Sequence, residues 1–224
     1  MKLCMIGTGY VGLVSGTCFA DIGNHVICVD KDKNKIEKLN AGISPIYEPG
    51  LNELIKKNYS AKRLFFTTDL KKAISLSDII FICVGTPNKK GSLKVDLSFV
   101  YKCTKEILKY TKKKKIIVTK STVPIGTGDE IEKIIKKKKK LFTVISNPEF
   151  LREGEAIRDF RYPDRIVLGS NNSKIFKIME KLYGPLINKG AKFFKTSRRG
   201  AELIKYASNA FFATKITFIN EIAN

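Results

Sequence analysis

Three glycines near the amino terminus have the spacing of a turn that binds phosphate. Gly7, Gly9 and Gly12 form a GxGxxG pattern between an apolar, strand-like run and a helix-like segment, and this context gives the pattern its meaning. The first glycine permits a tight turn, the second lets the backbone approach a pyrophosphate, and the third lets the helix pack close to the strand. Free N–H groups at the helix N-terminus then face phosphate oxygens. These residues predict a dinucleotide-binding site.

An acidic residue lies where the second expected strand ends. Asp30 follows the glycines at about the 20-residue distance typical of such sites. A carboxylate there accepts hydrogen bonds from an adenosine ribose and repels a 2′-phosphate, which favours NAD over NADP. The weaker alternative is that Asp30 only caps the next helix. Lys35, one turn into that helix, fits either a contact with the ribose or phosphate or a solvated side chain.

Hydroxyl groups follow two further expected strands. Thr86 comes after the strand 78–84, and Thr122 comes after the strand 115–120. Ligands of open α/β sheets bind at the carboxyl ends of the strands, so both side chains are placed to line the nicotinamide half of a cofactor crevice. Loop capping at these Thr-Pro and Val-Pro segments explains them equally well. Position alone leaves the two interpretations open.

A second group of polar residues lies farther along the chain. Glu149, Arg152 and Glu153 follow the strand 142–146 and therefore fall beside the expected cofactor site. Lys205 and Asn209 are spaced i,i+4 in a long helical pattern and share one helix face. A lysine and an amide together can donate hydrogen bonds to an oxyanion. Their spacing alone favours a solvated lysine and a packing amide.

Alternating strands and helices must position these residues. The apolar runs predict strands at 2–6, 25–30, 64–68, 78–84, 115–120, 142–146 and 165–169, and a short apolar piece at 192–194. Helical patterns occupy 11–22, 32–40, 69–76, 98–110, 127–138, 173–183 and 197 to the end. This alternation predicts an α/β fold with a doubly wound parallel sheet, Rossmann-like. We expect an NAD-binding domain over 1–196 and the start of a long connecting helix over 197–224.

The composition limits the classes of partner. The chain has 224 residues, with 42 Lys+Arg against 21 Asp+Glu, a net charge of +21. This charge suits nucleic acid, an anionic membrane surface or phosphorylated small molecules. The lysine runs 112–115 and 136–140 precede strands, which places them at the amino edge of the sheet, where we expect them to face solvent. No apolar stretch approaches the ~20 residues of a membrane-spanning helix.

The cysteines and the amino terminus indicate a cytoplasmic protein. We find no secretory signal in the first residues. Five cysteines without CxxC or Cys/His spacing argue against a disulfide framework and against a zinc site. They are expected in the core, at Cys4, Cys18, Cys28, Cys83 and Cys103.

Longer motifs add a resemblance to a known family. They are IGTGYVGLVSG (6–16), YEPGL (47–51), VGTP (84–87), KSTVPIGT (120–127), NPEFLREGEAIRDFRYPDRIVLG (147–169) and AELIKYASNAFFATKITFINE (201–221). The chain resembles the amino-terminal part of the UDP-glucose/GDP-mannose dehydrogenases over essentially its whole length. Its REGEAIRDF and PDRIV segments are more similar to members that act on UDP-glucose than to members that act on GDP-mannose or UDP-N-acetylmannosamine.

The resemblance implies an activity and an assembly. Two hydride transfers from C6 of UDP-glucose to two NAD+ would give UDP-glucuronate, through a cysteine thiohemiacetal and a thioester that water hydrolyses. The complete protein would be a homodimer through its central helix. The alternatives are another sugar-nucleotide 6-dehydrogenase, acting on GDP-mannose or a UDP-N-acetylhexosamine, and, less favoured, a basic nucleic-acid-binding module on a Rossmann scaffold. We expect no nucleic-acid or membrane partner.

The resemblance also implies roles for particular positions. The cofactor would contact Gly7, Gly9, Tyr10, Val11, Gly12, Asp30, Lys35, Thr86, Thr122 and Glu153. The UDP-glucose site would contain Glu149, Phe150, Leu151, Arg152, Glu153, Lys205 and Asn209. Glu149 would act as general base or acid through water, and Thr122 would order that water. Lys205 and Asn209 would stabilise the C6 oxyanion, and no metal takes part.

One departure from the family pattern concerns the nucleophile. The family cysteine lies in a GGxCFPKD-like segment beyond the long helix, and the chain does not contain such a segment. None of the five cysteines replaces it, because they fall in expected core strands and helices. We therefore expect the amino-terminal half of a protein of about twice this length. Alone, this half is expected to bind NAD without completing the oxidation, because the carboxyl-terminal UDP-sugar-binding domain is absent.

Overall fold

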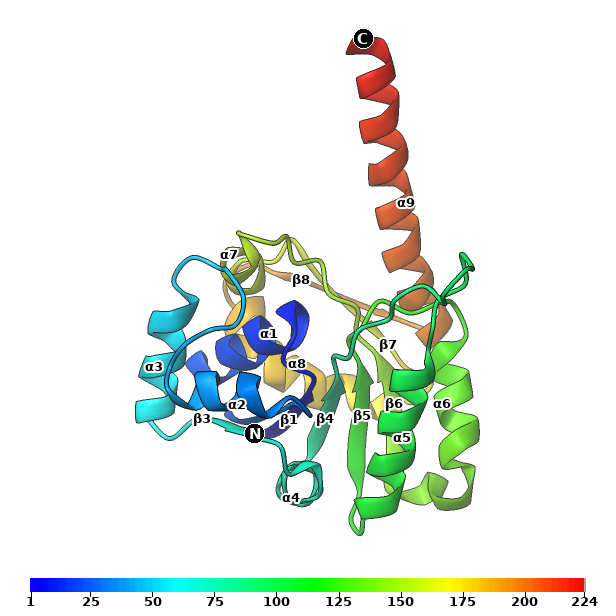
Figure 1. Cartoon of the computed structure of the whole chain (residues 1–224). Helices are drawn as coiled ribbons and strands as arrows, with labels where there is room; N and C mark the ends of the chain where they lie inside the picture. Colours follow the sequence, from blue (N-terminus) through cyan, green and yellow to red (C-terminus); the bar gives the residue numbers. More distant parts are fainter. Residues whose placement is uncertain (224) are drawn as a thin grey trace.

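Eight strands form one central sheet, which the computed structural model describes together with the helices for residues 1–223 (Figure 1). The sheet order is β3-β2-β1-β4-β5-β6-β7-β8. The strands are β1 (Lys2–Ile6), β2 (His25–Val29), β3 (Leu64–Thr67), β4 (Ile79–Ile82), β5 (Lys115–Thr119), β6 (Phe142–Ser146), β7 (Arg165–Gly169) and β8 (Lys192–Thr196). Asn224 lies outside the described residues.

Helices cover both faces of this sheet. They are α1 (Tyr10–Asp21), α2 (Lys33–Asn40), α3 (Leu51–Ser60), α4 (Leu70–Leu76), α5 (Ser98–Tyr110), α6 (Thr127–Ile135), α7 (Ala156–Arg161), α8 (Lys174–Ile187) and α9 (Arg198–Ala223), with a 3₁₀ turn over Lys136–Leu141. One apolar core includes residues of α1, α3, α7 and α8. A second core, on α4, α5 and α6, includes the opposite side chains of the same strands. The predicted α/β, doubly wound class is confirmed.

The strand order creates a reversal point where a ligand can bind. β1 pairs in parallel with β2 on one side and with β4 on the other. The chain therefore winds outward from β1 in both directions, and the loops after β1 and β4 separate at the carboxyl edge. In open α/β sheets, ligands bind in the crevice at this point. The GxGxxG turn occupies it.

One part of the predicted sheet is wrong. β6 and β7 pair antiparallel, through the single pair Ser146–Gly169, whereas a fully parallel sheet was expected. A parallel crossover needs a connection that usually holds a full helix, and the connection 147–164 holds only the six-residue α7. Because the two strands overlap only at their last residues, β7 extends beyond the carboxyl end of β6. Arg165, the first residue of β7, consequently lies beyond the carboxyl end of β6.

Two helices were missed by the sequence pattern, and one lysine was placed wrongly. Neither α3 nor α7 was predicted, although α3 has an apolar face with Leu51 and Ile55 fully buried. Lys115, expected to face solvent, is buried, and its ammonium group donates a hydrogen bond to the carbonyl of Ser77. The run 136–140 is exposed as expected.

Helix α9 starts in the body of the protein and then projects away from it (Figure 1). Its first two turns hold all of its buried residues, Arg198, Ala201, Glu202 and Lys205. From residue 207 to residue 223 its side chains are exposed except at 208, and they include Phe211, Phe212, Ile216, Phe218, Ile219 and Ile222. The base of α9 is thus fixed, and the remaining turns present a large apolar surface.

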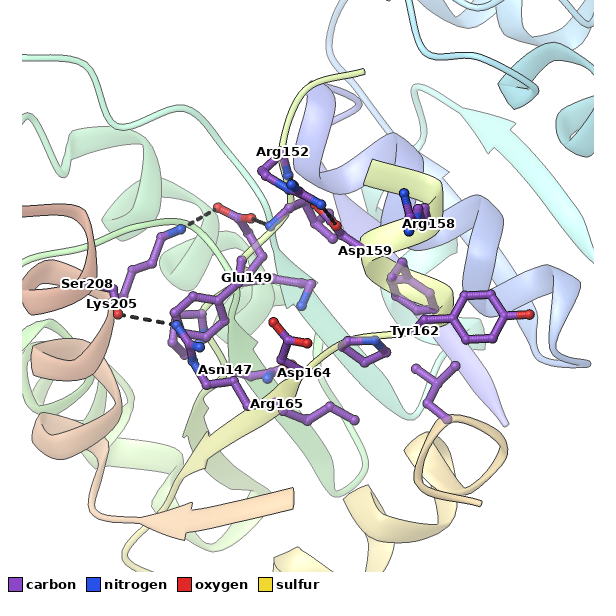
Figure 2. A pocket seen from close by; sticks show the side chains of 18 of the residues that line it. Asn147, Glu149, Arg152, Arg158, Asp159, Tyr162, Asp164, Arg165, Lys205 and Ser208 are labelled. Carbon is purple, nitrogen blue, oxygen red and sulfur yellow. Dashed lines mark hydrogen bonds and ion pairs between the residues drawn. The ribbon is translucent and has the colours of Figure 1, made fainter. Parts of the chain in front are cut away.

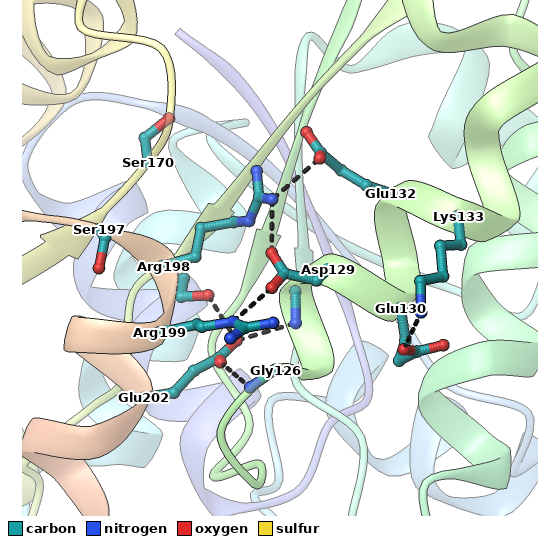
Figure 3. A network of polar contacts seen from close by, with 12 residues as sticks. Gly126, Asp129, Glu130, Glu132, Lys133, Ser170, Ser197, Arg198, Arg199 and Glu202 are labelled. Atoms are coloured by element: carbon teal, nitrogen blue, oxygen red, sulfur yellow. Dashed lines mark hydrogen bonds and ion pairs between the residues drawn. The ribbon is translucent and has the colours of Figure 1, made fainter.

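A polar network fixes the base of α9 against α6 (Figure 3). Arg198 donates to Asp129 at 2.7 Å and to Glu132 at 2.9 Å. Glu202, buried, accepts hydrogen bonds from the backbone N–H groups of Gly126 and Gly128 at 2.7 and 2.9 Å and from the Ser146 hydroxyl at 2.9 Å. These contacts join α9 to the loop that follows β5 and to the end of β6.

Close packing of α9 on β7 gives a test of this arrangement. A Cβ at Gly169 would lie 2.5 Å from the Ser197 carbonyl and 2.7 Å from the Ala201 Cβ. We expect Gly169→Ala to lower the free energy of unfolding by about 1–3 kcal/mol, the usual cost of overpacking, as measured by urea denaturation. Gly85→Ala is the control, because no atom lies within 4 Å of its added Cβ. Equal stability of the two variants would contradict this packing.

Candidate functional site

The glycine-rich turn has the geometry that its sequence pattern predicts. Gly7 has φ +103°, and a Cβ there would approach the Cys83 carbonyl to 2.7 Å. A Cβ at Gly12 would lie 1.9 Å from the Gly7 carbonyl. Both positions therefore exclude any side chain, because the Cys83 backbone that follows β4 lies against Gly7 and the Gly7 carbonyl lies against α1 at Gly12. Gly9 is different, since an added Cβ would meet open space.

The open space beside Gly9 fits a pyrophosphate. Gly9 is the N-cap residue of α1, and no side chain caps this helix. The first N–H groups of a helix lack partners within the helix, and the helix dipole favours an anion beside them. A residue with a side chain at Gly9 would fill the space that the phosphate oxygens need. Gly7, Gly9, Tyr10, Val11 and Gly12 form this turn and the first turn of α1, and their contact with the cofactor stays a prediction.

Asp30 holds the turn as well as facing the nucleotide end. Its carboxylate accepts hydrogen bonds from the Thr8 backbone N–H at 2.9 Å and the Thr8 hydroxyl at 2.8 Å, and from the Asp32 N–H at 3.1 Å. Partial burial acts to raise the pKa of this carboxyl, but the hydrogen bonds from Thr8 and Asp32 outweigh it and lower the pKa below its usual value. Asp30 is therefore ionised at neutral pH. Capping of α2 falls to Asp32 instead, which accepts from the Lys35 N–H.

The two hydroxyl residues lie against one another. The Thr86 hydroxyl donates to the Thr122 carbonyl at 2.9 Å, which links the loops after β4 and β5. Ser121 strengthens the link by donating to the Val84 carbonyl at 2.7 Å. Both loops lie at the carboxyl edge next to the glycine turn. The structure thus brings Thr86 and Thr122 together, while Thr86 itself has the loop-bracing bond that the capping interpretation expects.

A cavity of about 710 Å³ opens beyond the carboxyl end of β6 (Figure 2). The segment 147–152, the start of β7 and one face of α9 line it. Of the predicted substrate residues, it contains Glu149, Phe150, Leu151, Arg152, Lys205 and Asn209. The antiparallel β7 contributes Arg165 and Ile166 to the wall. Residues from positions 120 to 212 therefore meet in one pocket, because several neighbouring elements end or begin there.

Lys205 and Glu149 form a buried ion pair in this cavity (Figure 2). The Lys205 Nζ lies 3.1 Å from the Glu149 Oε1, and the two side chains are only 9% and 10% exposed. Glu149 also accepts a hydrogen bond from the Leu151 N–H, and the Lys205 ammonium lies 5.1 Å from the Phe150 ring centroid. A buried pair of this kind holds a positive and a negative group in fixed positions. The solvated-lysine interpretation of Lys205 is wrong.

The other predicted substrate residues differ in how they are held. Asn209 lines the cavity one turn beyond Lys205 and is exposed. Arg152 is also exposed, and its guanidinium binds Asp159 at 2.7 and 3.0 Å. Glu153 is exposed and lies outside the set of residues that line the cavity. Asn209 is thus available to a ligand, whereas Arg152 already has an anionic partner.

Several residues of the site were missed by sequence reasoning. Lys120 is buried and lines the cavity, and burial lowers the pKa of its ammonium group. Arg165 stacks its guanidinium 4.4 Å from the Phe150 ring centroid and donates to the Ser208 hydroxyl at 3.4 Å. Lys120 begins the KSTVPIGT motif, so its position at a strand end was a signal that could have been used. Arg165 depended on the reversal of β7.

Other classes of site find no support in residues 1–223. No cluster of three or more His, Cys, Asp or Glu side chains in this range could hold a metal ion. None of the helices described is long and apolar enough to cross a membrane. All five cysteines are free and buried, as expected. Cys83 packs against Gly7 and Gly12 of the glycine turn. Burial raises the pKa of its thiol to about 12.

The sheet order, the glycine turn and the carboxyl-edge cavity define a dinucleotide-binding protein of the Rossmann class. Residues 1–187 match the NAD binding domain of the UDP-glucose/GDP-mannose dehydrogenase family, and residues 199–224 match its central domain. The chain belongs to the UDP-glucose/GDP-mannose dehydrogenase family. The resemblance found in the motifs is thereby confirmed.

Curated relatives and solved structures agree with this family. The chain is 54% identical to a UDP-glucose 6-dehydrogenase of Rhizobium meliloti, over 100% of the chain and 52% of the relative. It is 52% identical to the UDP-glucose 6-dehydrogenase TuaD of Bacillus subtilis, over 100% of the chain and 48% of the relative. The chain therefore spans about half the length of the curated relatives it matches.

The fold comparison includes two dehydrogenases that are named for different substrates. A ternary complex of GDP-mannose dehydrogenase from Pseudomonas aeruginosa superposes with a TM-score of 0.93 and 37% identity, over 99% of the chain and 52% of that structure. A UDP-glucose dehydrogenase from Pyrobaculum islandicum gives a TM-score of 0.92 and 37% identity, over 98% and 51%. Backbone similarity alone consequently does not separate the two substrates.

The hydrogen bonds of Asp30 predict a dependence of stability on pH. Its folded pKa lies below the unfolded value of about 3.9, so its contribution is complete above that pH and is lost as the pH falls through the folded pKa. At pH 7 we expect Asp30→Asn to lower the free energy of unfolding by about 1 kcal/mol. Urea denaturation at pH 7 and in steps towards pH 3 should show this difference shrinking. A difference in the free energy of unfolding that stays constant with pH would contradict this role of Asp30. The control is Asp164→Asn, at an exposed position.

Proposed function

We propose that this chain supplies the NAD-binding half, and part of the sugar-nucleotide site, of an enzyme that oxidises UDP-glucose at C6 to UDP-glucuronate. The observation that carries the proposal is the buried Glu149–Lys205 pair in the carboxyl-edge cavity, beside a glycine turn with room for a pyrophosphate. The names of two similar curated relatives support UDP-glucose as the substrate. The related sugar nucleotides GDP-mannose and UDP-N-acetylhexosamines are the alternatives.

The cavity residues suit the removal of a proton and a hydride from a primary alcohol. NAD+, when bound, supplies the hydride acceptor. Lys205 and Asn209 place an ammonium and an amide N–H on one helix face, where both can donate to the oxygen that becomes negative as its proton leaves. Glu149 accepts that proton through an intervening water, which we expect Thr122 to order. The Lys205 ammonium lies 3.1 Å from the Glu149 Oε1 and holds this carboxylate in position beside it.

The complete reaction needs a second oxidation and a nucleophile. The alcohol, two NAD+ and one water give the carboxylate, two NADH and three protons. A thiolate would capture the aldehyde, and the thioester left by the second hydride transfer would be hydrolysed by water. Burial raises the pKa of Cys18 to about 12 and of Cys103 to about 11, and it raises the pKa of Cys4 and Cys28 as well. We therefore propose that the thiol comes from the part of the relatives that this chain does not cover.

Two further features support proposals about the oligomeric state and the cellular compartment. The exposed apolar side chains of α9 support a homodimer in which this helix packs against its copy. We propose a functional division at the start of α9, with the NAD-binding domain over 1–196 and the dimerisation helix from 197. Five unpaired cysteines support a reducing compartment, and hence the cytoplasm.

The proposed function is tested by supplying the carboxyl-terminal half of a relative together with this chain. We expect the chain, co-expressed with the carboxyl-terminal half of the Rhizobium meliloti relative, to form two NADH per UDP-glucose, measured by absorbance at 340 nm. GDP-mannose and UDP-N-acetylmannosamine are the comparison substrates. Faster formation of NADH with either of these than with UDP-glucose would contradict UDP-glucose as the substrate. Lack of NAD+ binding by the chain in calorimetry, combined with salt-sensitive binding of DNA or RNA, would favour the nucleic-acid alternative.

The roles of Lys205 and Asn209 are tested in the same two-part enzyme. Lys205→Ala or Asn209→Ala should each lower kcat by about 10²- to 10³-fold, the cost of one oxyanion donor. NAD+ affinity should stay close to its original value, because neither residue lies at the glycine turn. Leu203→Ala, an exposed substitution on the same helix, is the control and should retain activity. Near-normal turnover of both active-site variants would refute the assignment.

A further inference from the structure

Glu48 is a buried carboxylate that the proposed chemistry does not use. It belongs to the YEPGL motif in the connection between α2 and α3, and only 7% of its surface is exposed. Its own backbone carbonyl accepts a hydrogen bond from the Leu51 N–H at the start of α3. This contact fixes the backbone position from which its side chain reaches the cofactor side of the molecule.

The two oxygens of Glu48 bind two segments that are far apart in sequence. Oε2 accepts a hydrogen bond from the hydroxyl of Tyr10, the first residue of α1 and part of the GxGxxG turn. The same oxygen accepts from the Gly154 N–H at 2.9 Å, and Oε1 accepts from the Ile157 N–H at 3.1 Å. The Gly154 N–H also donates to the Tyr10 hydroxyl. One side chain thus joins the nucleotide turn to the segment that leaves the sugar cavity.

The Tyr10 phenol remains a hydrogen-bond donor at this junction. Burial and the hydrogen bond to Glu48 raise the pKa of Tyr10 to about 12, so the phenol keeps its proton at neutral pH and remains a donor. Charge-assisted hydrogen bonds of this type are about twice as strong as neutral ones. Loss of the carboxylate would leave the Ile157 N–H buried without this acceptor, because Ile157 itself is buried.

A second carboxylate makes comparable contacts at the opposite end of α1. Asp21 binds Lys57 of α3 at 2.7 Å and Arg161 of α7 at 2.8 Å. The helices α1, α3 and α7 are therefore held together at both ends of α1. Glu48 holds the end beside the nucleotide turn, and Asp21 holds the end far from it. A comparison of variants at Glu48 and at Asp21 therefore separates an effect on the response to the ligand from an effect on stability.

We propose that Glu48 is a positioning residue through which a dinucleotide at the glycine turn orders the segment 149–157 that borders the sugar cavity. The proposal rests on the proposed function. A ligand at the N-terminus of α1 restrains Tyr10, Tyr10 restrains Glu48, and Glu48 restrains the N–H groups of Gly154 and Ile157. The start of this segment includes Glu149 and Phe150 in the cavity wall. Cofactor binding thereby restrains one side of the wall of the sugar cavity.

The test is hydrogen exchange of the 224-residue chain with and without saturating NAD+, read by mass spectrometry. In the unaltered chain, NAD+ should slow exchange in the first turn of α1 and, by about tenfold, in 152–157. In Glu48→Ala, NAD+ should still slow exchange in α1 but leave 152–157 unchanged. Slowing of 152–157 by the original factor in this variant would overturn the inference.

Two further variants make the result decisive. Asp21→Asn should lower the melting temperature and keep the full response of 152–157 to NAD+, because it acts at the far end of α1. Loss of that response in Asp21→Asn would show a purely structural effect and would also overturn the inference. Tyr10→Phe removes one hydroxyl, leaves the Gly154 and Ile157 contacts with Glu48 intact, and should abolish the response. It decides the question even if Glu48→Ala does not fold.

The inference and the proposed function fail in different ways. No slowing of exchange in α1 of the unaltered chain at saturating NAD+ would overturn both. Slowing in α1 with a response of 152–157 that does not depend on Glu48 or Tyr10 would overturn the inference alone and would leave NAD+ binding intact.

Discussion

Backbone N–H groups in the loops at the carboxyl edge of the sheet must find acceptors, and three carboxylates supply them. Asp30 accepts from the Thr8 and Asp32 N–H groups, Glu48 from those of Gly154 and Ile157, and Glu202 from those of Gly126 and Gly128. Each carboxylate thereby fixes a loop that no strand pairing holds. An unpaired buried N–H costs about 1–3 kcal/mol, so these contacts largely determine the loop positions.

The three acceptors also explain why the functional groups are placed where they are. Asp30 holds the glycine turn from the end of β2. Glu48 joins that turn to the loop after β6. Glu202 joins the loop after β5 to α9 one turn before Lys205, which brings the Lys205 ammonium to Glu149. Each carboxylate thus connects one segment of the candidate cofactor or sugar site to another, and these contacts preorganise the site.

The described residues contain the features expected for cofactor binding but no exposed thiol. The glycine turn, Asp30 and the linked loops after β4 and β5 are complete in this chain. The cavity has a buried ion pair and an exposed amide, but all five cysteines are protonated, buried core residues. The exposed apolar turns of α9 leave the cavity region beside a surface suited to a protein partner. These features fit the NAD binding domain of the UDP-glucose/GDP-mannose dehydrogenase family.

Hydrophobic periodicity and glycine spacing are local signals, so they predicted the alternating elements, the glycine turn and the strand ends that carry Thr86, Thr122 and Glu149. The motifs also indicated the family. The antiparallel direction of β7, the burial of Lys205 against Glu149 and the contact of Glu48 with Gly154 became visible only in the folded structure. Those outcomes depend on packing and on hydrogen bonds between distant residues, 106 positions apart for Glu48 and Gly154. A local pattern contains no information about which distant N–H group a carboxylate will meet.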